Sequence, residues 1–334
     1  MARPDRLSRR AEGYALVVMA ATCWAGGGLI AKWLFTAPGA ATMSWPFPPL
    51  GIEVDPLVLS AARAVVSTVI ALGYLVVRRR DQLAIRGRDV PFLAVFGVFG
   101  LALVHFAYFK TISLTGVATA ILLEYLAPVV VLVFSVLLLG ERLTWVLPSA
   151  VLLSVSGCAL MVGVLGGEGL TVSREGLFWG LASAVLFAGY SLMGRYAANR
   201  FSPWTLLTYG LAAASLFWLI VLGGPGRIVD LLSDWRAVLA VVVLAVVSTI
   251  VPFGAFLKAL HLIEATQASV TSTIEPVVAG VAAWFVFGEH LGALQLVGGA
   301  LVITAVALSQ FRTRVPAEMP VVAEESLGDS PSRA

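Results

Sequence analysis

Two acidic residues lie within long apolar stretches, each close to a proline. Glu124 is four residues before Pro128, so the two share one face of a helix, and Glu275 directly precedes Pro276. If these stretches cross a bilayer, each carboxyl costs at least about 2.5–3.5 kcal/mol at a helix centre and needs a partner or a function. A proline also frees a backbone carbonyl, which is tolerated where the break lines a cavity. The pattern predicts two acidic groups beside a midplane site; a structural hydrogen bond to the opened turn is the alternative.

A histidine and an arginine also lie inside apolar stretches. His105 shares a face with Tyr108 and is expected to bind a substrate or relay a proton, because histidine titrates near neutrality. A neutral packing role is the alternative. Arg63 is expected to pair with a carboxylate, either Asp55 or one of the two glutamates, although a long side chain can also reach toward the interface.

Aromatic, small and hydroxyl-bearing residues complete the predicted site. Trp24 stands next to three glycines, and Tyr190 follows Gly189 in a similar setting, so these positions serve either close helix packing or a ligand wall. Thr271 and Gln267 are four and eight residues before Glu275, on its helix face. The predicted substrate-binding residues are Trp24, Gly27, His105, Tyr108, Glu124, Pro128, Tyr190, Phe256, Gln267, Thr271, Glu275 and Pro276.

The elements that must position these residues are membrane helices. Of the 334 residues 59% are hydrophobic and only 12% are charged, about half the charged fraction of a soluble domain, and mean hydropathy is +0.94. The net charge is +3, and most of the basic residues lie in short segments between apolar runs. This distribution indicates membrane topology and not nucleic-acid binding. Ten stretches have near-spanning length: residues 14–35, 57–77, 91–109, 116–139, 145–165, 177–196, 204–222, 237–257, 265–287 and 291–311.

The basic residues predict an orientation. When the connections are assigned alternately to two sides, one side collects fifteen Lys and Arg residues and the other five. By the positive-inside tendency both termini are expected in the cytoplasm, with the chain in the inner membrane. Residues 1–12 form a cytoplasmic segment and residues 312–334 a disordered cytoplasmic tail in this prediction.

The sequence repeats itself. A shift of 148 residues aligns 110–161 with 258–309 without a gap, with 13 identities in 52 positions. The identities include Pro128 with Pro276, and the Gly-Glu pair at 140–141 with the one at 288–289. Residues 13–166 and 175–311 are therefore predicted to be two five-helix repeats. Because five is odd, the second repeat must run through the bilayer upside down, an architecture that suits alternating access to a shared midplane site. The expected fold is an all-α integral membrane protein with ten transmembrane helices.

The paired motifs resemble a known family. LEYLAPVVVLVFSVLLLGERLT (123–144) and IEPVVAGVAAWFVFGEHLG (274–292), with TCWAGGGLIAK (22–32), are similar to the EamA-type branch of the drug/metabolite transporter superfamily. The resemblance covers residues 13–310 and implies transport of amino acids, other metabolites, drugs or sugars. The chain departs from the pattern at His290, where the family usually carries Arg, and in a longer connection at 36–56.

The function expected is secondary export of small amphipathic metabolites such as amino acids, without a cofactor. Drugs or sugars are the alternative substrates. An intramembrane enzyme is a further alternative, but Gly189-Tyr190-Ser191 begins like a nucleophile elbow and then has Met193 in place of the second glycine. A channel would need a filter ring that the sequence does not show. The expected partners are a small-molecule substrate and the lipid bilayer, with no nucleic acid, and the chain is expected to act as a monomer.

Overall fold

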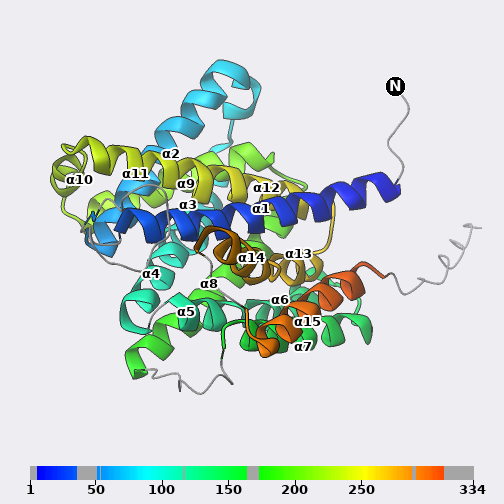
Figure 1. The fold of residues 1–334 in the computed structure, drawn as a ribbon. Coiled ribbons are helices and arrows are strands. Elements are labelled where there is room, and N and C mark those ends of the chain that lie inside the picture. Colours follow the sequence, from blue (N-terminus) through cyan, green and yellow to red (C-terminus); the bar gives the residue numbers. More distant parts are fainter. Residues whose placement is uncertain are drawn as a thin grey trace, which may run out of the picture.

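The computed structural model describes residues 6–35, 51–52, 54–115, 117–163, 173–287 and 291–311, and within these ranges the secondary structure is helical (Figure 1). The α-helices are α1 (Arg6–Phe35), α2 (Pro56–Arg78), α3 (Val90–Gly97), α4 (Leu103–Thr115), α5 (Val117–Glu124), α6 (Ala127–Leu139), α7 (Val146–Met161), α8 (Arg174–Ala197), α9 (Pro203–Val221), α10 (Gly226–Leu231), α11 (Trp235–Ala245), α12 (Val251–Leu260), α13 (Ala265–Ser272), α14 (Glu275–Phe287) and α15 (Ala293–Gln310). Short 3-10 helices η1 (Arg80–Leu83) and η2 (Gly87–Asp89) precede α3, and π-helical turns η3 (Val98–Ala102) and η4 (Val246–Ile250) join α3 to α4 and α11 to α12. The predicted all-α class is confirmed.

The predicted number of ten spans is not confirmed. All ten apolar stretches fall on helices, but in the described ranges only eight helical segments are long and apolar enough to cross a membrane. One of the other two, α7, has only 16 residues. The stretch at 265–287 is broken at Thr273 and Ile274 into α13 and α14, so neither piece reaches the length of a span. The segments 1–5 and 312–334, most of the connection at 36–56, and His290 lie outside the described residues.

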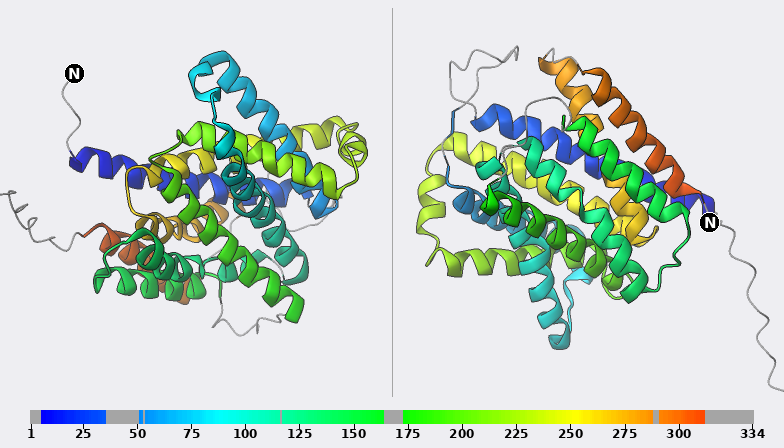
Figure 2. Two further views of the ribbon diagram at one scale, coloured as in Figure 1. Left: turned by 180° about the vertical axis from the view of Figure 1, so that it is seen from behind. Right: turned by 90° about the horizontal axis from the view of Figure 1, so that it is seen from below.

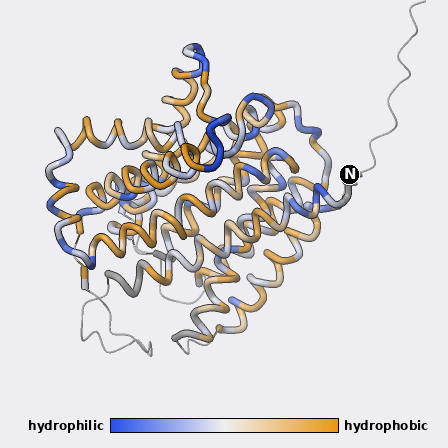
Figure 3. Tube along the Cα trace, turned by 90° about the horizontal axis from the view of Figure 1, so that it is seen from above, coloured by the Kyte–Doolittle hydropathy of each residue, from blue (hydrophilic) through white to orange (hydrophobic). Residues whose placement is uncertain are grey.

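Polar residues gather at the helix ends and connections, while the helix bodies are hydrophobic (Figure 3). The start of α1 and the end of α15 lie on the same side of the bundle (Figures 1 and 2). The Tyr14 hydroxyl donates to the backbone carbonyl of Ser309 over 3.2 Å, which joins these two helices near their outer ends. One hydrogen bond thus links the first and last helices, while α15 packs mainly against α7.

The connection between α2 and α3 packs against the connection between α8 and α9. The Ser202 hydroxyl donates to the Gln82 side chain over 2.8 Å, and the Tyr209 hydroxyl donates to the Leu83 carbonyl over 2.6 Å. Arg200 forms an ion pair with Asp89. The ends of α2 and α8 therefore lie on one side of the bundle.

Two irregular features recur at the 148-residue offset found in the sequence. The π-helical turns η3 and η4 start at Val98 and Val246. The break at Tyr125-Leu126 between α5 and α6 corresponds to the break at Thr273-Ile274. The equivalent segments of the two halves therefore depart from regular α-helix in the same places.

The backbones of the two halves approach each other closely where α7 meets α15. A Cβ built on Gly298 would be 2.6 Å from the carbonyl oxygen of Gly157, and one built on Gly157 would be 2.7 Å from the carbonyl oxygen of Gly298. Small residues allow this contact because lipid provides no hydrophobic force between helices, so close van der Waals packing must hold them together. Cys158, next to Gly157, is fully buried beside this contact.

We expect Gly298→Ala to lower the free energy of unfolding in detergent by about 1–3 kcal/mol, because the new methyl would meet backbone atoms that cannot move aside. The matched control is Gly73→Ala, where a Cβ meets nothing within 4 Å. That change should stabilise α2 by about 0.5–1 kcal/mol through the lower conformational entropy of alanine. Equal thermal stability of the two variants would contradict the close contact.

Candidate functional site

Three of the predicted aromatic positions meet in one cluster. The Trp24 ring lies 5.8 Å from the ring of Phe256, measured between centroids, and 5.3 Å from the ring of Phe253. Tyr190 is fully buried 5.8 Å from Phe256, and its hydroxyl donates to the Phe253 carbonyl over 2.9 Å. In this conformation Tyr190 and Phe256 are core residues and Trp24, half-buried, covers them.

Gly27 serves a close helix contact. A Cβ at this position would lie 1.9 Å from the Ser248 hydroxyl oxygen, in the π-helical turn η4. The glycine therefore lets α1 approach η4. The buried Ser248 hydroxyl has no hydrogen-bond partner among the described residues.

The two glutamates lie at the two helix breaks. Glu124 is the last residue of α5 and Glu275 the first of α14. The Tyr125 hydroxyl donates to the Glu275 carboxylate over 2.7 Å. Glu124 and Tyr108 both interact electrostatically with Glu275. The structure thus brings Tyr108, Glu124 and Glu275 into one polar group and adds Tyr125, which the sequence interpretation missed although it directly follows Glu124.

The two prolines begin the helices that follow the breaks. Pro128 is the second residue of α6 and Pro276 the second of α14, and both are buried. At this position a proline loses nothing, since the first amides of a helix have no partner within it. Each proline therefore sets where its helix starts.

The polar groups of Gln267 and Thr271 are engaged with backbone. The Gln267 amide donates to the Ser309 carbonyl over 3.1 Å, and the Thr271 hydroxyl donates to the Gln267 carbonyl over 2.7 Å. Both residues are buried. The first bond joins α13 to α15, and the second lies within α13.

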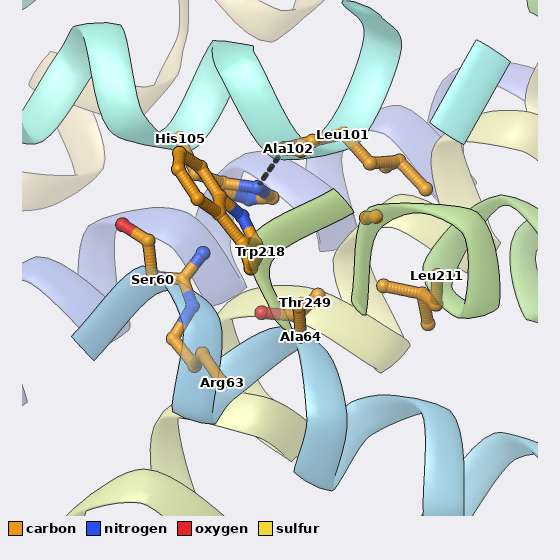
Figure 4. A pocket seen from close by; sticks show the side chains of 10 residues that line it. Ser60, Arg63, Ala64, Leu101, Ala102, His105, Leu211, Trp218 and Thr249 are labelled. Atoms are coloured by element: carbon orange, nitrogen blue, oxygen red, sulfur yellow. Dashed lines mark hydrogen bonds between the residues drawn. The ribbon is translucent and has the colours of Figure 1, made fainter. Parts of the chain in front are cut away.

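His105 and Arg63 line a small cavity between α2, α4 and α9 (Figure 4). Its free volume is about 10 Å³, room for roughly one or two water molecules. One ring nitrogen of His105, Nδ1, lies 2.6 Å from the Leu101 carbonyl, and its other nitrogen, Nε2, is buried with no hydrogen-bond partner among the described residues. The lining residues are Ser60, Arg63, Ala64, Leu101, Ala102, His105, Leu211, Ala214, Trp218 and Thr249.

The expected pairing of Arg63 with Asp55 is wrong. Asp55 instead accepts a hydrogen bond from Arg227 over 2.8 Å and caps α2 by accepting from the Leu57 amide over 2.8 Å. No carboxylate lies within 4 Å of the Arg63 guanidinium in the part of the chain that the structure describes. Its described contact is with the Phe109 ring, whose centroid lies 5.1 Å away. Sequence reasoning had no means of locating Arg227, which is 172 residues from Asp55.

Glu141, in the connection before α7, caps a helix of the other half. One carboxylate oxygen accepts from the backbone amide of Ala265 over 2.8 Å, and the other accepts from the Thr266 hydroxyl over 2.6 Å. Burial raises the pKa of the Glu141 carboxyl above its ordinary value, against the opposing effect of these hydrogen bonds. The first turn of α13 is therefore held by the connection that precedes α7.

Two further ion pairs lie at helix ends, and both are largely exposed. Lys110 lies 3.3 Å from Glu175, and Lys258 lies 2.6 Å from Glu12. Across the described ranges no group of three or more His, Cys, Asp or Glu residues could hold a metal ion. Two groups of buried polar side chains therefore remain as candidates for binding chemistry: the acidic group near Glu275, and Arg63 with His105.

The comparison with family models decides the family. The model of the EamA-like transporter family matches the chain twice, over residues 11–163 and 174–311. The chain belongs to the EamA-like transporter family. It is a multi-pass membrane transporter of EamA type, and the family is one of transporters and not of enzymes.

Relatives of this EamA-like transporter carry transporter names. It is 30% identical over 246 residues to the pseudopaline exporter CntI of Pseudomonas aeruginosa, covering 72% of this chain and 84% of the relative. It is 29% identical to a probable terminal-alkyne amino-acid exporter of Streptantibioticus cattleyicolor, covering 76% and 84%. An uncharacterized transporter of Archaeoglobus fulgidus is 33% identical, covering 65% and 74%. A solved crystal structure, 22% identical, has the same fold, with a TM-score of 0.70 over 90% of this chain and 96% of the other.

Removing the Glu141 cap should destabilise the transporter. We expect Glu141→Ala to lower the free energy of unfolding by about 1–3 kcal/mol, because it leaves the buried Ala265 amide and Thr266 hydroxyl without an acceptor. Glu175→Ala is the control, since it removes only an exposed ion pair worth about 0–1 kcal/mol. A Glu141→Ala protein as stable as the control would show that α13 does not need this cap.

The cap of α2 gives a pH-dependent prediction. The Leu57 amide and the Arg227 guanidinium hold the pKa of Asp55 below its ordinary value. The contribution of the ionised Asp55 carboxylate to the free energy of unfolding is therefore present above about pH 3.9. It is lost as the pH falls through the pKa of Asp55 in the folded state. We expect Asp55→Ala to cost about 0.5–2 kcal/mol at pH 7 and less near pH 3, measured by unfolding in detergent. Asp55→Asn, which keeps the capping oxygen, should cost less; a penalty that does not change with pH would contradict the ionised cap.

Proposed function

We propose that this EamA-like transporter is a secondary exporter of small amphipathic metabolites such as amino acids, working by alternating access between two inverted five-helix repeats. The observation that carries the proposal is the pair of helix breaks at the same repeat offset, with Glu124 and Glu275 at their ends. Discontinuous membrane helices with exposed termini are the usual setting of midplane substrate sites in transporters built from inverted repeats. The proposed substrate site comprises the aromatic cluster, the acidic group and His105.

The arrangement of the connections supports the inverted topology. The α2–α3 connection, rich in arginine, is hydrogen-bonded to the α8–α9 connection, which carries Arg200. The first connection follows the second helix of the first repeat, and the other follows the first helix of the second repeat. With five crossings per repeat, both connections fall on the same side of the membrane, as their hydrogen bonds require. With the positive-inside tendency, this side is the cytoplasmic face of the inner membrane and both termini lie there.

The substrate class follows from the chemistry of the interior and from the relatives. The proposed site has aromatic walls and few charges, which suits an amphipathic solute better than a phosphorylated one, since phosphate binding calls for several Arg or Lys side chains. Two relatives are named as exporters, one of pseudopaline and one of a terminal-alkyne amino acid. The sequence carries no phosphate-binding loop, so transport is driven by a gradient or by exchange.

The test is export from proteoliposomes loaded with a panel of metabolites. We expect saturable flux of at least one amphipathic solute. Glu275→Gln should lower its kcat/KM by about tenfold or more, because a charged partner of the substrate and of Tyr125 is lost; tenfold corresponds to about 1.4 kcal/mol. Arg227→Gln, which alters an exposed pair, is the control. Unsaturable flux would indicate a pore, and normal transport by Glu275→Gln and Glu124→Gln proteins would exclude the acidic group from the site.

A further inference from the structure

The same ion pair between the two halves occurs twice, at positions that match in the repeat. Lys110, in the second half of α4, lies 3.3 Å from Glu175 in the first turn of α8. Lys258, in the last turn of α12, lies 2.6 Å from Glu12 in α1. The lysines are 148 residues apart, and the glutamates are 163 residues apart. The two shifts differ by 15 residues because the first half has the longer connection at 36–56.

A close helix contact lies beside each ion pair, and it is repeated at the same two shifts. A Cβ built on Gly176 would lie 3.6 Å from the Cβ of Leu114, and one built on Gly13 would lie 3.1 Å from the Cβ of Leu262. Each glycine directly follows the glutamate of its ion pair. The α4–α8 contact therefore comprises Lys110, Leu114, Glu175 and Gly176, and the α1–α12 contact comprises Glu12, Gly13, Lys258 and Leu262.

The two contacts lie at opposite ends of the bundle. The α4–α8 contact is at the start of α8, where Glu175 lies. Near the other end of α8, Arg195 donates to the Leu260 carbonyl over 2.6 Å, two residues after Lys258. Twenty residues separate Glu175 from Arg195. In an α-helix they span about 30 Å, which is also the thickness of the hydrocarbon core of a bilayer. Each contact therefore joins the halves at one face of the membrane.

Between these two ends, residues that match in the repeat touch each other. Trp24 and Phe187, which are 163 residues apart, have ring centroids 5.8 Å apart. His105 and Phe253, which are 148 residues apart, have ring centroids 4.8 Å apart. A residue that contacts its own repeat equivalent lies at the pseudo-two-fold axis between the halves. In this conformation the halves thus meet at both ends and along the axis between them.

We propose that the α4–α8 contact and the α1–α12 contact are the two gates of the transporter, and that each opens while the other stays closed. An exposed ion pair contributes little stability, so it can break and form again in every cycle. The small glycine gives each gate a close packing surface when it shuts. Because the contacts are equivalent, a rocking motion that separates one has a counterpart that separates the other. This inference rests on the proposed alternating access and assigns the residues that close its two ends.

The first test measures the opening of each gate without any substrate. The reporters are Leu114→Cys and Leu262→Cys, both partly buried at a gate glycine. They are placed singly in a protein that carries Cys23→Ala and Cys158→Ala, so that each variant has one thiol. The protein is held in lipid nanodiscs, where both faces are accessible, and labelling by a charged maleimide is followed by mass spectrometry.

Reversing a gate charge should open that gate. We expect Lys110→Glu to speed labelling of Leu114→Cys about threefold or more, because it replaces an attraction with a repulsion. Adding Glu175→Lys should restore the slow rate. Arg174→Glu, which reverses an exposed charge one residue away, is the control and should change nothing. The matched changes in the other gate should act likewise on its reporter, and opening one gate should slow labelling at the other.

The second test locks each gate during transport. Lys110→Cys with Glu175→Cys, or Glu12→Cys with Lys258→Cys, is joined by a short bis-methanethiosulfonate cross-linker that replaces the reach of the two side chains. We expect saturable export from metabolite-loaded proteoliposomes to fall about tenfold or more in either locked protein and to return on reduction. The control is Lys110→Cys with Ser113→Cys, because both lie on α4 and their cross-link does not join the halves.

The outcomes separate the gates from the transport function. Labelling rates that no charge reversal changes, or undiminished export by a locked protein, overturn the gates while the transport function stands. If the wild-type protein shows no saturable export, the transport function fails, and the labelling rates still decide whether the contacts open in turn. If Lys110→Glu does not yield a monodisperse protein, Lys110→Gln replaces it: faster labelling supports the gate, and an unchanged rate overturns it.

Discussion

Every backbone amide within a membrane must find its partner inside the protein, and this constraint governs where the helices of this chain can be irregular. At the first break the Leu126 amide bonds the Leu123 carbonyl over 3.2 Å, and at the second the Ile274 amide bonds the Thr271 carbonyl over 3.2 Å. These tightened turns satisfy the amides that a regular helix would have paired one residue further back. Each proline follows within two residues and has no amide to satisfy. The breaks therefore expose carboxylates to the interior without leaving unpaired backbone donors at these positions.

The same constraint explains why Glu141 reaches across the molecule. Because α13 starts inside the protein, its first amides have no water to bond, and a carboxylate from the connection before α7 takes that place. The cap is thus also a link between the two matched halves. The glutamate of the Gly-Glu pair at 140–141 therefore has a structural role that requires no contact with a substrate.

Much of the architecture could be predicted from the sequence, because a bilayer demands long apolar helices and because duplication leaves matched prolines and Gly-Glu pairs. Within the described ranges, each of the ten apolar stretches lies mostly on one or two helices. What could not be predicted are the partners of polar side chains across long separations. Tertiary packing brings Arg227 to Asp55, Tyr125 to Glu275 and Gln267 to Ser309, where each pair forms a hydrogen bond. No local sequence pattern indicates these pairs. Pro276 indicated a break near Glu275, but the sequence did not indicate that this break divides the stretch at 265–287 into two separate short helices.

The contact between Gly157 and Gly298 has a mechanical consequence. Where two backbones touch without side chains between them, neither helix can slide or tilt without opening a void or forcing atoms together, so relative displacement is restricted there. A second contact of this kind joins Gly97 of α3, next to η3, to the Gly210 carbonyl of α9. Rotation about the line between the two contacts is the motion of one half against the other that both contacts permit.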